Sequence, residues 1–105
     1  MKERTDLIEE AGNLLELKMN ALLSKEIGIY LQKYPVKTSQ QYRYSKENKL
    51  VCLAETEMSK IFEIFTQNFA SEGLGCTVDT SCVYFGISHL STSKLEQVIN
   101  NLKNK

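Results

Sequence analysis

The first third of the chain carries a helical pattern of apolar residues that is long for a protein of this size. Between residues 6 and 34, apolar side chains recur at steps of three and four, the spacing of one face of an α-helix. Pro35 ends the pattern, because proline disfavours helical geometry in the residue before it. One helix over 6–34 would measure roughly 43 Å, whereas a globule of this length is about 33 Å across. We therefore expect the helix either to break near 24–28, at Ser24 or Gly28, or to overhang the body and pair with a second copy.

The remaining sequence alternates between strand-like and helical patterns. It predicts a basic and aromatic β-hairpin over 35–55, a helix over 56–72, one strand or a second hairpin over 75–88, and a C-terminal helix over 93–103. This order predicts an α+β fold in which an antiparallel sheet packs on helices. The chain length leaves room for one domain, spanning 1–105.

The phases of these patterns also predict core residues. Leu15 in the first helix, Leu53 in the hairpin, and Phe62 and Phe65 in the second helix are expected to be buried. Truncating a large buried side chain to alanine removes roughly 2–5 kcal/mol of stability. These four residues are therefore the sequence's strongest predictions about packing.

Charge and cysteine content restrict the cellular setting. Thirteen basic residues balance thirteen acidic ones, so no overall field attracts nucleic acid or an anionic membrane. No stretch approaches the ~18 consecutive apolar residues of a membrane span, and residues 1–6 are charged rather than typical of a secretory signal. The three cysteines are an odd count without an export signal, which favours free thiols in a reducing compartment. We expect a cytoplasmic protein that does not enter a membrane.

The residues that could carry chemistry are isolated. His89 is the single histidine, and a metal ligand or general base needs partners at fixed spacing. Cys76 and Cys82 are six apart and would face each other only across a five-residue loop, so we expect them to stay unbridged. The close carboxylates Glu55 and Glu57 stand where a helix begins, which the helix dipole explains. The sequence predicts no catalytic, cofactor or metal residues, and therefore no enzyme.

A segment rich in tyrosine and basic residues is the one suggestive feature. Between residues 33 and 49 it holds five basic side chains and one acid. Aromatic and basic side chains together suit a protein surface or a single-stranded nucleic acid, although a solvated hairpin whose tyrosines cover one sheet face explains the same residues. The candidate partner-binding residues are Tyr34, Lys37, Tyr42, Arg43, Tyr44, Lys46 and Lys49.

These observations predict a small non-enzymatic protein-binding or inhibitory, regulatory module that acts through its surface. The long apolar face of 6–34 predicts a homodimer, because two-fold pairing is the commonest way to cover such a face. The alternative function is a nucleic-acid-binding regulator that uses the basic and aromatic segment.

Overall fold

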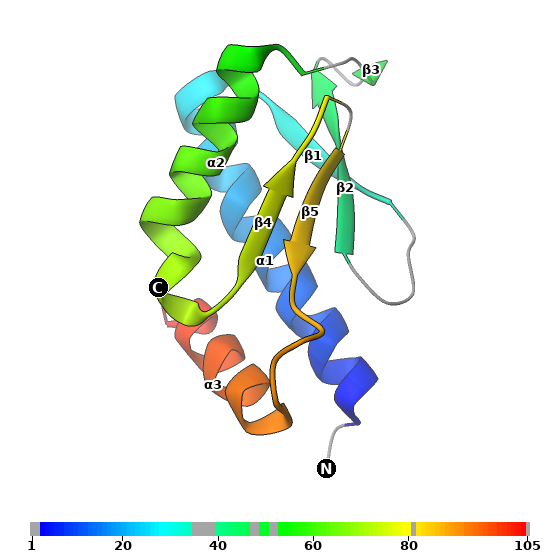
Figure 1. The fold of residues 1–105 in the computed structure, drawn as a ribbon, viewed down its shortest axis with the longest axis vertical. Coiled ribbons are helices and arrows are strands. Elements are labelled where there is room, and N and C mark those ends of the chain that lie inside the picture. Colours follow the sequence, from blue (N-terminus) through cyan, green and yellow to red (C-terminus); the bar gives the residue numbers. More distant parts are fainter. Residues whose placement is uncertain (1–2, 35–39, 47–48, 51–52, 81, 105) are drawn as a thin grey trace.

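The computed structural model describes residues 3–34, 40–46, 49–50, 53–80 and 82–104, and for 33–34, 40–46 and 49–50 it describes the backbone alone. The elements follow one another as α1 (Arg4–Ile27), β1 (Tyr30–Tyr34), β2 (Gln40–Lys46), β3 (Lys49–Leu50), α2 (Glu55–Phe69), the short 3-10 helix η1 (Ala70–Glu72), β4 (Gly75–Val78), β5 (Cys82–Gly86) and α3 (Thr92–Lys103). The predicted α+β class is confirmed (Figure 1).

The N-terminal helix ends where the sequence offers a break. Helix α1 stops at Ile27, and Gly28 follows in the left-handed region with φ of 67°. A residue without Cβ adopts that conformation at little cost, so the chain can leave the helix there. Of the two alternatives, the break near 24–28 is the one that the structure shows, whereas helix over 30–34 is wrong because those residues form β1. With 24 residues, α1 measures about 36 Å and fits the 40 Å long axis of the molecule.

The strands form an antiparallel sheet with the order β1-β2-β5-β4, and β3 pairs with the end of β2. Residues 75–88 therefore contain a hairpin, β4 with β5, rather than one strand. The hairpin predicted over 35–55 is present as β2 with β3, which is described over Lys49–Leu50, whereas β2 pairs mainly with β1 and β5. Leu53 and Ala54 fall within the range predicted for this hairpin but lie outside any strand.

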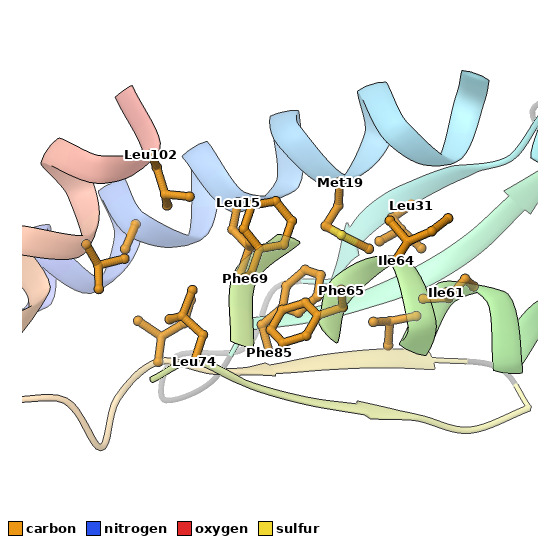
Figure 2. Packing of buried hydrophobic residues seen from close by; sticks show 14 of the residues in the cluster. Leu15, Met19, Leu31, Ile61, Ile64, Phe65, Phe69, Leu74, Phe85 and Leu102 are labelled. Carbon is orange, nitrogen blue, oxygen red and sulfur yellow. The ribbon is translucent and has the colours of Figure 1, made fainter. Parts of the chain in front are cut away.

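The core lies between the sheet and the helices on one of its faces (Figure 2). Leu15 and Met19 of α1 meet Phe65 and Phe69 of α2 above β5, and the rings of Phe65 and Phe85 stack with their centroids 5.5 Å apart. The apolar stripe of α1 is thus buried within its own chain, against α3, β1 and α2. The length of α1 therefore gives no reason to expect a second copy of the chain to cover this stripe.

Three of the four predicted core residues are confirmed. Leu15, Leu53 and Phe65 are at most 5% exposed, but Phe62 is 51% exposed and its predicted burial is wrong. The buried stripe of α2 is set by Ile61, Ile64, Phe65 and Phe69. A helix turns about 100° per residue, so Phe62 lies next to this stripe at the edge of the buried face, where about half of its side chain is in contact with solvent.

Candidate functional site

The strand β4 lies at one end of the sheet, and its outer edge has no strand partner among the described residues. Asp79, which follows β4, donates its backbone N–H to the carbonyl oxygen of Cys82 at 3.0 Å. The backbone groups of an antiparallel strand point alternately to one side and to the other. Counting back from Asp79, Thr77 bonds to β5, whereas the N–H and C=O groups of Cys76 and Val78 point to the outer edge.

A groove runs along this edge, between β4 and α2. In Figure 1, α2 runs beside β4 on the side away from β5. The α2–β4 groove is open to solvent and has a volume of about 430 Å³. It is lined by Glu55, Met58, Ser59 and Phe62 of α2 and by Cys76, Thr77 and Val78 of β4.

The floor of the groove is apolar. Met58 and Phe62 are four residues apart on α2, which puts them on one side of the helix. Cys76 and Val78 pair with the buried residues Phe85 and Val83, and residues paired across two strands share one face of the sheet. Their half-buried side chains therefore stand on the same side of the sheet as α2. A side chain entering the groove would meet apolar surface from both walls.

The α2 side of the groove is acidic. A second hollow of about 400 Å³ continues from the groove over α2 and is lined by Glu55, Thr56, Ser59, Lys60 and Glu63. The Lys60 ammonium lies 3.5 Å from a carboxylate oxygen of Glu63 and 3.8 Å from one of Glu26. Glu55, which lines both hollows, is exposed and has no hydrogen bond or ion pair with another described residue. Two carboxylates thus flank the Lys60 ammonium, and together with Glu55 this group of three acids and one base has a net charge of −2.

The thiol in the groove is held in its neutral form. Burial raises the pKa of Cys76 to about 12, from an ordinary value of 9.0, because a thiolate loses solvation inside the protein. A neutral thiol is a poor nucleophile and behaves as a small apolar group. Cys76 therefore serves as part of the apolar wall and not as a reactive centre.

The opposite edge of the sheet, along β1, is covered at Leu31. The side-chain amide of Asn20 on α1 meets both backbone groups of Leu31. The Leu31 N–H donates to Asn20 Oδ1 at 2.6 Å, and Asn20 Nδ2 donates to the Leu31 carbonyl oxygen at 3.1 Å. An amide offers one donor and one acceptor in the arrangement of a neighbouring strand. At this residue the amide takes the place of a strand partner.

The candidate residues taken from the sequence that the structure describes lie on β1, β2 and β3. Lys37 is outside the described residues, and the other six are described by their backbone alone. The register pairs position 42 with the buried Val83 and position 44 with the buried Leu31, whereas position 43 pairs with the exposed Gln32. The two tyrosine positions therefore fall on the opposite face of the sheet from the Arg43 position. The predicted role of these residues stays a prediction.

Sequence reasoning missed the residues of the groove. Phe62 and Met58 look like core residues of an amphipathic helix, and Cys76 and Val78 like ordinary strand residues. A signal for Phe62 was present: an aromatic next to Ile61, with Ile64 and Phe65 completing a buried stripe without it. The acid at position 57 does have the expected structural role, because Glu57 Oε1 accepts the Ala54 N–H at 3.0 Å at the start of α2.

The structure also places the single histidine and the two described cysteines. His89 is an exposed loop residue, and its Nε2 lies 3.0 Å from the carbonyl oxygen of Gly73. Cys76 and Cys82 are both free, as predicted, since the register pairs them with Phe85 and Arg43 respectively. Within the described ranges, three or more His, Cys, Asp or Glu side chains nowhere gather in a metal-binding arrangement.

None of the helices in the described part of the chain combines the length and apolar character needed to cross a membrane. Comparison with protein-family models, with curated proteins and with solved structures gave no match to this chain.

Proposed function

We propose that this chain is a non-enzymatic, regulatory protein-binding module that takes up an extended segment of a partner protein on the outer edge of β4. The observation that carries the proposal is the open edge itself. The backbone groups of Cys76 and Val78 point outward beside an apolar groove, in a sheet whose other edge is covered at Leu31. Addition of a strand to a free edge is a recurrent mode of peptide recognition.

The geometry dictates how such a segment would lie. Two of its residues, i and i+2, would exchange backbone hydrogen bonds with Val78 and Cys76. Their side chains would then share a face with Val78 and Cys76 and enter the groove against Met58 and Phe62. Each hydrogen bond contributes about 0.5–1.5 kcal/mol net, and ordering the segment offsets much of this. Apolar side chains at alternate positions therefore supply the affinity.

The first experiment uses a fluorescent peptide of sequence Lys-Thr-Val-Thr-Val-Thr, with both ends blocked, and follows its binding to the chain by fluorescence anisotropy. Amide hydrogen exchange of Cys76 and Val78 should slow in the complex, since their N–H groups would gain acceptors. Phe62→Ala should weaken binding because it removes half-exposed apolar surface from the groove.

The matched control is a change in the peptide backbone. N-methylation of the two valines removes the donors that would face β4 and should abolish binding, whereas N-methylation of the threonines between them should leave it intact. Equal binding of the two methylated peptides, or no slowing of exchange at Cys76 and Val78, would refute strand addition at this edge.

The homodimer predicted from the sequence becomes a rival occupant of the same edge, because the face of α1 on which it was based is buried. Sedimentation of the chain alone tests it. The nucleic-acid alternative would show itself as oligonucleotide binding that weakens steeply with salt. A cytoplasmic, reducing location is consistent with the free thiols of Cys76 and Cys82.

A further inference from the structure

We infer that the segment bound on β4 carries a basic residue two positions before its first groove-facing apolar residue, and that Glu55 holds this basic side chain. The inference rests on the proposed function and names the chemistry of the partner: an extended segment of the pattern basic-x-apolar-x-apolar. The inference is based on charge complementarity at the end of the groove where α2 begins.

Glu55 is placed to meet such a residue. It opens the first turn of α2 and lines both the α2–β4 groove and the second hollow beside it, so the residue lies where the two meet. It is exposed, and no other described residue forms a hydrogen bond or ion pair with it. A cationic side chain reaching Glu55 would therefore displace no existing partner within the described structure.

The surroundings leave the position acidic. Lys60 is the described basic residue that lines the second hollow, and it already lies between Glu26 and Glu63. Its charge is therefore shared by two carboxylates, and it does not neutralise Glu55. A carboxylate without a counter-charge attracts a cation, over a range that salt limits to about 8 Å at physiological ionic strength, and repels an acidic side chain.

The direction of the bound segment follows from the fold. The N–H of Leu53 donates to the carbonyl oxygen of Thr80 at 2.6 Å, which ties the start of α2 to the turn between β4 and β5. Glu55 therefore lies at the Val78 end of β4, as Figure 1 shows for the start of α2. A strand antiparallel to β4 enters at this end, so its N-terminal residues come to Glu55 first. Residue i−2 stands on the same face as i and i+2 and points to the α2 side.

Charge also argues against a second copy in the groove. Two-fold pairing of β4 with β4 would bring two α2 surfaces together, each carrying Glu55 and Glu63 on the exposed side. Both partners would add negative charge to the same interface, with one ammonium each. A basic segment of another protein meets no such repulsion.

The experiment compares four blocked peptides by anisotropy: Lys-Thr-Val-Thr-Val-Thr, the same peptide with glutamate in place of lysine, the same order reversed, and the lysine peptide with both valines N-methylated. Each is titrated against the wild-type chain, Glu55→Gln, Glu55→Lys and the control Glu96→Gln. Glu96 is an exposed acid of α3, so this control makes the same change in charge away from the groove.

The lysine peptide should bind the wild-type chain about twofold to fivefold more tightly than the glutamate peptide, the range for one exposed ion pair. Glu55→Gln should remove this preference, Glu55→Lys should reverse it, and Glu96→Gln should leave it unchanged. High salt should reduce it. The reversed peptide should bind more weakly than the original.

Equal binding of the lysine and glutamate peptides, or a preference that survives Glu55→Gln, would overturn the inference about the basic residue. Loss of binding on N-methylation would in that case still support strand addition. If N-methylation has no effect, the proposed function itself fails, and a concentration-dependent dimer displaced by the peptide would identify the second copy as occupant instead.

Discussion

The two edge strands of this sheet, β1 and β4, differ in what their outward backbone groups meet. At β1 the outward backbone groups of Leu31 are bonded by the side chain of Asn20, a residue of the helix that packs behind the strand. At β4 the outward groups of Cys76 and Val78 face an apolar groove instead, next to a half-exposed phenylalanine. An unpaired edge is a site where other chains can add a strand, and proteins usually protect it.

The β1 edge is protected at Leu31, whereas the β4 edge is where we propose that a partner segment binds. Asn20 lies on α1, whose packing against β1 and α3 is extensive, and its amide fills one donor and one acceptor position without lengthening the sheet. The edge of β4 is short, at four residues, which limits indiscriminate pairing. Under the proposed function, a short edge beside an apolar wall would accept a segment with suitable side chains and disfavour others.

The largest expected effect is a difference in stability loss between a core residue, Phe65, and a residue of the groove, Phe62. Phe65→Ala should lower the free energy of unfolding by about 3–5 kcal/mol, because it leaves a cavity against Phe69 and Phe85. Phe62→Ala should cost at most about 1 kcal/mol, since half of that side chain is already in water. Urea unfolding measures both, and equal losses would show that Phe62 belongs to the core.

A smaller effect is expected at the covered edge. Asn20→Ala leaves the part-buried N–H and C=O groups of Leu31 without partners and should cost about 1–3 kcal/mol. It should also open the β1 edge, so that light scattering detects association as concentration rises. The control Asn100→Ala, at an exposed position of α3, should change stability by no more than about 0.5 kcal/mol. Unchanged stability and mass in Asn20→Ala would remove the difference between the two edges.

The smallest expected effect is on the reactivity of the Cys76 thiol on β4, and it is absent at neutral pH. Burial raises the pKa of Cys76 to about 12, so its thiolate is scarce well above pH 9. In a Cys52→Ser, Cys82→Ser protein, alkylation by iodoacetamide should be slow at pH 8 and accelerate toward pH 12. A bound peptide should slow it further. Fast alkylation at pH 8 would mean that the groove admits water to the sulfur.

The same shift has a consequence for stability. The folded pKa lies above the unfolded value, so the contribution of Cys76 is constant below pH 9 and is lost as the pH rises through 9 toward 12. The difference in unfolding free energy between the parent and Cys76→Ala should therefore shrink in that alkaline window and stay level between pH 6 and 8.

Local patterns were sufficient for most of the elements. The three-and-four spacing of α1, the capacity of Gly28 for positive φ, and the apolar phases of α2 and α3 each depend on neighbours within a few residues. The strand β1 was missed because Tyr30 and Leu31 continue the helical spacing. The spacing of apolar residues gives no information about the change of chain direction at Gly28. A period describes a helix but does not show where it ends.

The sequence by itself determined the α+β class, the presence of the three helices, the burial of Leu15 and Phe65 and the free state of Cys76 and Cys82. Only the tertiary structure decided that β5 inserts between β2 and β4, which leaves β4 at the end of the sheet, and that Asn20 reaches Leu31 eleven residues away. It also decided that Phe62 stands at a groove and not in the core. The reason is physical: periodicity follows from backbone geometry within one element, whereas the order of strands follows from how distant elements bury their apolar faces together.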